Sequence, residues 1–112
     1  MNEQTYNIWS WSTTTFSGSE GTIYYNDFLV YVVLDFTSRE CRTRNEWTQL
    51  GTINVPSGYR PNAVIYIGTN DPNIKLRIKN NGNLEYYNSG TGVITLSNTN
   101  MSIMYPRTSS LP

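Results

Sequence analysis

The stretch from Thr22 to Thr37 is the most apolar part of the chain. Read with a period of two, its even positions form an unbroken apolar face of Phe28, Val30, Val32, Leu34 and Phe36. The odd positions are also apolar in the middle, and they are acidic only at the two ends. β-Branched and aromatic residues dominate, so we expect one long strand. One sheet packed on a core needs only one apolar face, so the second face must be covered by another layer of the chain or by another copy of it. For so short a chain we favour another copy.

Short alternating segments separated by turn residues fill the rest of the sequence. They predict strands over Tyr6–Ser12, Trp47–Val55, Ala63–Thr69, Ile74–Lys79, Asn83–Tyr87, Val93–Ser97 and Met101–Tyr105. The segments Thr13–Gly21 and Ser38–Glu46 have the composition of loops. No helical periodicity of useful length occurs. Seven or eight short antiparallel strands at this spacing predict an all-β fold, a Greek-key β-barrel or sandwich, with residues 1–112 forming a single domain.

The clearest alternation belongs to the segment Ile74–Lys79, which predicts an apolar inner face and a cationic outer face. The dipeptide Asn81-Gly82 follows it and is a strong hairpin signal, typical of a type I′ turn with positive φ at both residues. In such a hairpin Glu85 would lie on the cationic face, near Lys75 or Arg77.

Charge and composition narrow the classes of function. The formal net charge is zero and 14% of residues are charged, so we expect neither nucleic-acid binding nor membrane insertion. No apolar run reaches the roughly 18 residues needed to span a bilayer. Nine tyrosines and three tryptophans instead favour polar-aromatic surfaces of the kind that bind carbohydrate or protein.

Catalytic and metal-binding options are few. The chain has no histidine and one cysteine, Cys41, so it offers no Ser-His-Asp or Cys-His arrangement and no zinc site of soft ligands. Asp71 and Glu85 are the least implausible glycosidase pair, although nothing in their spacing forces them together. Asn70, Asp71 and Asn73 form a weak calcium candidate that is more simply a turn. We therefore expect a protein that is not an enzyme and has no cofactor or metal.

Saccharide binding has better physical support. An aromatic ring can stack on the apolar side of a pyranose, while carboxylates accept hydrogen bonds from its hydroxyls and arginine suits a phosphodiester. The candidates are Trp47 with Tyr86 or Tyr87 for stacking, Glu85 and Asp71 for the hydroxyls, and Arg107 or Arg77 for phosphate. The alternative for each is an ordinary structural role in the core, a hairpin charge pair, a turn or a solvated tail.

One part of the sequence resembles a known family. The run LGTINVPSGYRP from Leu50 to Pro61, an apolar strand, and then IKLRIKNNGNLEYY resemble the C-terminal head domains of tail-tip receptor-binding proteins from phages of Gram-positive bacteria, in particular lactococcal siphophages. The resemblance covers about the C-terminal half of the chain. It implies a homotrimer of Greek-key barrels similar to viral fibre knobs, located in the virion at the tail tip or baseplate.

The same resemblance implies the ligand and the partners. The ligands would be host cell-wall saccharides, including phosphoglycerol-decorated ones, and N-terminal regions preceding Met1 would contact other tail and baseplate proteins. Some heads of this family place a histidine in the saccharide pocket, and this chain has none, so its pocket would need a different donor set. The alternative is a structural knob that trimerises a tail fibre and binds no ligand.

Overall fold

The computed structural model describes residues 11–42, 45–69, 71–96 and 99–107, and over these residues the chain forms ten β-strands and one short 3₁₀ helix. The elements are β1 (Ser12–Ser17), β2 (Gly21–Tyr25), β3 (Leu29–Phe36), β4 (Arg39–Cys41), β5 (Thr48–Ile53), η1 (Ser57–Tyr59), β6 (Ile65–Gly68), β7 (Ile74–Ile78), β8 (Asn83–Asn88), β9 (Ile94–Leu96) and β10 (Thr99–Pro106). The predicted all-β fold is confirmed. None of the described elements is a helix long and apolar enough to cross a membrane.

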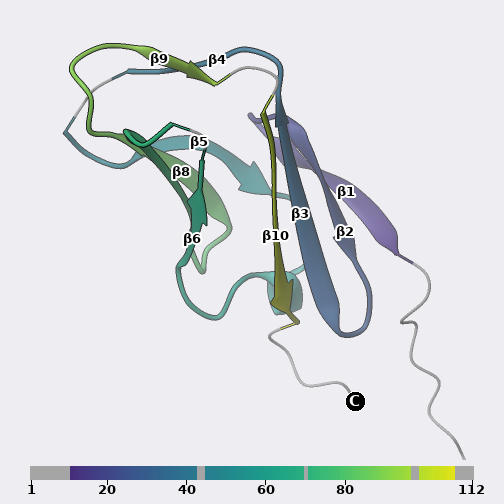
Figure 1. Cartoon of the computed structure of the whole chain (residues 1–112). Coiled ribbons are helices and arrows are strands. Elements are labelled where there is room, and N and C mark those ends of the chain that lie inside the picture. The colour runs from purple at the N-terminus through teal and green to yellow at the C-terminus, as the bar shows by residue number, and fades with distance from the viewer. Residues whose placement is uncertain (1–10, 43–44, 70, 97–98, 108–112) are drawn as a thin grey trace, which may run out of the picture.

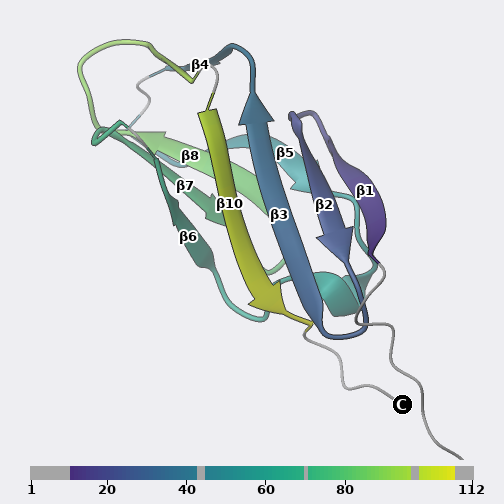
Figure 2. The same cartoon turned by 45° about the vertical axis from the view of Figure 1, so that its right-hand side comes forward.

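Eight of these strands form one antiparallel sheet in the order β10-β3-β2-β1-β5-β8-β7-β6. Strand β1 joins the two halves, because Ser12–Thr15 pair with β2 while Phe16 and Ser17 pair with β5. The edge strands β6 and β10 come near each other, so the sheet is a nearly closed barrel (Figures 1 and 2). The order β5-β8-β7-β6 is that of a Greek key with the chain direction reversed. Strands β4 and β9 form a separate ribbon over one end of the barrel.

The core lies between the two halves of the sheet, which face each other in Figure 2. The inward side chains of β3 are those predicted from its even positions, and Val30, Val32, Leu34 and Phe36 are all fully buried. The inward side chains of β7 also match the prediction, since Ile74, Leu76 and Ile78 are buried. Alternation with a period of two therefore located the core face of both strands.

The prediction of one continuous strand from Thr22 to Thr37 is wrong, because the chain reverses between β2 and β3. The side chain of Asn26 makes this turn: its Oδ1 accepts hydrogen bonds from the backbone N–H of Phe28 at 2.8 Å and of Leu29 at 2.9 Å. The backbone N–H of Asn26 also donates to the carbonyl of Leu29 at 3.0 Å. An asparagine side chain can replace backbone partners in this way, and Phe28 at the turn is consequently 38% exposed rather than in the core.

Two predicted loops contain strands. Most of the segment Thr13–Gly21 belongs to β1, where threonines occupy strand positions that their branched side chains favour. The segment Ser38–Glu46 contains the short strand β4, which pairs with β9. The strand predicted over Tyr6–Ser12 falls almost wholly outside the described residues, and only its last residue, Ser12, belongs to β1. The other predicted strands correspond to β5 to β10, with bounds shifted by at most two residues.

The hairpin at Asn81-Gly82 is confirmed, but its turn is not type I′. A type I′ turn needs a positive φ at both central residues. Gly82 has φ of 91°, but Asn81 does not have a positive φ, because Asn45 is the only non-glycine residue of the described ranges that does. The Gly82 N–H donates to the carbonyl of Lys79 at 2.8 Å, and the Lys79 N–H donates to the carbonyl of Asn83 at 2.9 Å. The connection is thus a three-residue loop that ends in a left-handed glycine.

The outer side of the β10-β3-β2 half carries an apolar face. We define the apolar face as the outward side chains of Tyr24, Leu29, Tyr31, Val33 and Met104. Met104, Tyr31 and Tyr24 lie in one row across the three strands, and the two tyrosine rings are 6.1 Å apart. Met104 is 50% exposed and the other four side chains are partly buried. This is the second apolar face of the central segment, and within the single chain it points away from the core.

Candidate functional site

The outer side of the other half of the sheet carries a different kind of surface. One row of paired residues crosses four strands, from Tyr66 on β6 through Arg77 on β7 and Glu85 on β8 to Gln49 on β5. Trp47, just before β5, and Tyr87 on β8 lie one row further along, because Thr48 pairs with Tyr86. We define the polar-aromatic face by these six residues: Trp47, Gln49, Tyr66, Arg77, Glu85 and Tyr87.

Arg77 is at the centre of the polar-aromatic face and has two kinds of partner. Its Nε donates a hydrogen bond to Glu85 Oε1 at 2.7 Å. Its guanidinium carbon lies 4.1 Å from the centre of the Trp47 ring, in the range of a cation–π contact. The side chains of Arg77 and Glu85 are only 19% and 12% exposed. The ion pair is therefore largely buried, with Arg77 packed on the Trp47 ring.

A cluster of three aromatic rings adjoins this ion pair through Trp47. The Trp47 ring lies 6.0 Å from that of Tyr66 and 5.6 Å from that of Tyr87, with interplanar angles of 57° and 54°. Tyr66 is 63% exposed, so one side of its ring is open to solvent. Tilted rings at these distances are favourable aromatic contacts. They form a surface on which a flat apolar ring can stack, with charged groups beside it.

The polar-aromatic face continues into a group of hydrogen-bonded amides and hydroxyls. Gln49 Nε2 donates to Thr52 Oγ1 at 3.0 Å and to Asn83 Oδ1 at 3.4 Å. Thr52 Oγ1 in turn donates to Asn83 Oδ1 at 3.3 Å. Planar amides and hydroxyls of this kind both donate and accept, which suits the recognition of a polyhydroxylated molecule.

Four of the seven residues predicted for a saccharide site come together on this face: Trp47, Arg77, Glu85 and Tyr87. The pairing of Glu85 with Arg77, rather than with Lys75, follows from the register of the β7–β8 hairpin. Tyr66 was not among the predicted residues. The sequence feature that could have identified it is the alternation in β6. Ile65 and Ile67 turn toward the core, so Tyr66 between them must face outward.

Tyr86 does not belong to the site. It is 4% exposed, and its hydroxyl is hydrogen-bonded to the backbone of Arg42. It lies between Glu85 and Tyr87 on the opposite face of β8, because side chains alternate along a strand. Of the two tyrosines proposed for stacking, only Tyr87 has a ring on the outer surface.

Asp71 also lies apart from the polar-aromatic face, in the turn between β6 and β7. Its Oδ1 accepts the Asn73 backbone N–H at 2.8 Å, and its own N–H donates to Thr69 Oγ1 at 3.2 Å. Glu85 pairs with Arg77, which is three residues beyond Ile74 at the start of β7 and so roughly 10 Å further along the strand. Asp71 is a turn residue. The structure does not bring its carboxylate together with that of Glu85, as a glycosidase pair would require.

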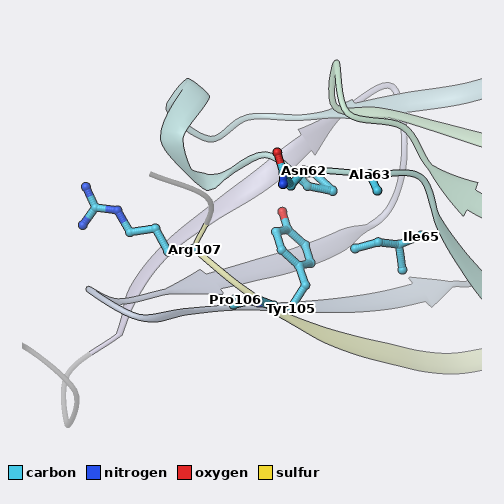
Figure 3. Close-up of a pocket in the computed structure, with 7 residues that line it drawn as sticks. Asn62, Ala63, Ile65, Tyr105, Pro106 and Arg107 are labelled. Atoms are coloured by element: carbon cyan, nitrogen blue, oxygen red, sulfur yellow. The ribbon is translucent and has the colours of Figure 1, made fainter. Parts of the chain in front are cut away.

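Arg107 lies at a separate place, beside a cavity of about 300 Å³ near the end of β10. The cavity is lined by Pro61, Asn62, Ala63, Ile65, Tyr105, Pro106 and Arg107. Figure 3 shows the guanidinium of Arg107 extending away from Tyr105 and the rest of the lining. It lies over the Tyr59 ring at 4.6 Å, and the Tyr105 hydroxyl donates to the Tyr59 carbonyl at 2.6 Å. Arg107 therefore does not join the other predicted site residues.

Within the described ranges, no group of three or more His, Cys, Asp or Glu side chains could hold a metal ion. The Asn73–Asp71 contact belongs to the turn described above, and Asn70 falls outside the described residues. Comparison with known protein families, curated proteins and solved structures finds no match to this chain.

Proposed function

We propose that this chain is the receptor-binding head of a phage tail, a non-enzymatic domain that attaches to saccharides of the host cell surface. The observation that carries the proposal is the polar-aromatic face, in which the Arg77–Glu85 ion pair lies against Trp47 and the Trp47 ring contacts those of Tyr66 and Tyr87. The sequence resemblance supports the same function and extends the ligands to phosphoglycerol-decorated wall saccharides. On this proposal the protein acts in the virion, at the tail tip or baseplate.

The chemistry of a saccharide fits such a surface. The C–H side of a pyranose ring stacks on an aromatic face, while its hydroxyls need planar donors and acceptors at the rim. Tyr66 and Trp47 supply the stacking surface, and Glu85, Gln49 and Asn83 supply oxygens or amides near it. The cavity beside Arg107 is less suitable, because carbon-rich side chains line most of it and the guanidinium points away.

Weak binding at each site is sufficient for attachment to a cell if several copies bind together. Linked sites on one particle multiply the overall affinity by 10²–10⁴, which is the usual range for multivalent attachment. We propose that the chain forms a homotrimer in which the apolar face of one copy packs on a neighbouring copy. This arrangement leaves the polar-aromatic face, on the other half of the sheet, available to the host surface.

The test is a titration of the protein with solubilised wall saccharide from a host strain, followed by amide chemical shifts. Shifts should concentrate on β5 to β8, and Trp47→Ala should abolish them. Phe28→Ala serves as the matched control, because it removes an aromatic ring that is 38% exposed in the β2–β3 turn. A trimer that shows no shift with any wall fraction would instead support the purely structural knob. Release of reducing sugar from host walls would contradict the non-enzymatic assignment.

A further inference from the structure

The cations on the outer side of β7 differ in their surroundings. Lys75 and Arg77 alternate with the buried residues of β7, and Lys79 directly follows the strand at the next position of the same alternation. Arg77 alone of the three has an ion-pair partner among the described residues, namely Glu85. It is also the one that lies over the Trp47 ring, which in turn contacts the rings of Tyr66 and Tyr87. The centre of the polar-aromatic face is therefore occupied by a neutralised cation.

Glu85 restricts what Arg77 can offer to a ligand. The Nε donor is already used at 2.7 Å, and the guanidinium is stacked on Trp47, so the side chain has little freedom to turn toward an incoming anion. Both members of the pair are less than one-fifth exposed, where water screens charges poorly. A phosphate that approached Arg77 would also approach the Glu85 carboxylate and would be repelled by it.

We propose that Glu85 sets the charge preference of the polar-aromatic face. The centre of this face binds a neutral sugar ring and repels a phosphate. This inference rests on the proposed function and narrows it. The anionic parts of a decorated wall polymer would have to lie away from Arg77, while a neutral hexose stacks over Trp47 and Tyr66. The phosphate-binding role first considered for Arg77 is thereby replaced by the fixing of ring hydroxyls.

The neighbouring lysines do not cancel this effect. Lys75 and Lys79 are each two residues from Arg77, about 6–7 Å along the strand. Lys75 is exposed, and among the described residues neither lysine has an ion pair or a ring contact like those of Arg77. Their attraction for anions is therefore diffuse and is weakened by salt at physiological ionic strength. A fixed, partly buried carboxylate acts at short range and is screened far less.

The experiment compares glucose with glucose 6-phosphate, a pair that differs only in the charged group. Each is titrated into the isotope-labelled protein in about 150 mM salt, where exposed charges are largely screened. Wild type should bind glucose more tightly than glucose 6-phosphate, because the Glu85 carboxylate repels the phosphate. Glu85→Gln should instead favour the phosphorylated sugar by at least about fivefold, because removing one partner frees the other charge. Glu40→Gln is the matched control, since Glu40 is exposed and lies only 3.9 Å from Arg42 on the separate ribbon. Its ratio should equal that of wild type.

Two further measurements separate an effect of the freed Arg77 charge from a loss of folding. The double variant Arg77→Gln/Glu85→Gln should lose the preference for phosphate, since the gain acts through the freed guanidinium, and a thermal melt shows whether each variant is folded. The inference is overturned if wild type itself binds glucose 6-phosphate more tightly than glucose in this salt, or if Glu85→Gln leaves the ratio unchanged. If neither sugar shifts the face, the proposed saccharide function fails at this site. A titration with inorganic phosphate then tests the role of Glu85 by itself. The role stands only if Glu85→Gln binds phosphate and wild type does not.

Discussion

The hydroxyl of Tyr86 links β8 to the end of β4 by two hydrogen bonds to one residue, Arg42. It accepts the Arg42 backbone N–H at 3.0 Å and donates to the Arg42 carbonyl at 3.2 Å. The ring itself is buried, so this polar atom is satisfied inside the protein. A core residue thereby fixes the ribbon of β4 and β9 to the barrel.

Tyr86→Phe should therefore reduce stability without changing the proposed binding of saccharide. The variant leaves two backbone groups of Arg42 without their partner, at a cost of about 1–2 kcal/mol. For a domain of this size the melting temperature should fall by roughly 4–8 °C. Thermal unfolding followed by circular dichroism measures this, and Tyr87→Phe is the control. An unchanged melting temperature would mean that water replaces the hydroxyl at no cost.

At Gly51 the neighbouring backbone leaves no space for a side chain. This residue follows the irregularity in β5 between Gln49 and Gly51, and a Cβ added there would lie 2.6 Å from the Ser17 carbonyl oxygen and 2.8 Å from the Ser19 Cβ. Gly51→Ala should lower the free energy of unfolding by about 1–3 kcal/mol, the usual cost of overpacking.

Gly68→Ala is the matched control for this substitution. A Cβ at Gly68, on β6, would have no atom within 4 Å. Urea unfolding should place this variant within about 0.5 kcal/mol of wild type, as for most surface changes. Equal loss of stability in both variants would show that the close approach at Gly51 can relax.

The alternation of the sequence identified the core faces but missed one turn, for a physical reason visible at Asn26. In β2 the inward residues include Ile23 at an odd position, whereas in β3 they are Val30 and Val32 at even positions. This change of parity shows that β2 and β3 are not one continuous strand. The apolar character of the flanking residues concealed it, since both strands are rich in β-branched and aromatic side chains.

The candidate site could be predicted only as far as local pairing extends. Glu85 was placed near Arg77 because a short turn fixes the register between β7 and β8. The contact of Tyr66 with Trp47 depends on strands that are distant in sequence and meet only when the sheet forms. The separation of Arg107 from these residues could not be predicted for the same reason, because its position is set by the end of β10 and by the contact with Tyr59.

Glu20 gives the fold an acid-sensitive contact. Its carboxylate accepts hydrogen bonds from the Thr37 hydroxyl and from the Thr37 backbone N–H, the latter at 2.9 Å, and so joins the β1–β2 turn to the end of β3. These bonds, the hydroxyl first, hold the pKa of Glu20 below its ordinary value of 4.5. Because the folded state prefers the charged form, the contribution to stability is complete above the unfolded pKa and is lost as the pH falls through the lower, folded pKa.

Glu20→Gln should therefore lose less stability than wild type between about pH 5 and about pH 3. Urea midpoints measured across that range test this. Thr37→Val, which removes the hydroxyl but keeps the backbone donor, should give an intermediate result. Parallel pH profiles for wild type and Glu20→Gln would show that the contact does not contribute to folding in solution.

Val33 tests whether the apolar face is covered by another copy of the chain. It lies on β3 between Ser102 of β10 and Thr22 of β2, in the row beside Tyr31. Val33→Asp should dissociate the proposed homotrimer, because a carboxylate buried in an apolar interface without a partner costs several kcal/mol. Light scattering coupled to size exclusion gives the mass, and Thr95→Asp, at an exposed position of β9, is the control. A variant that keeps both the full oligomer mass and the wild-type melting temperature would contradict this interface, because its carboxylate would then be in contact with water.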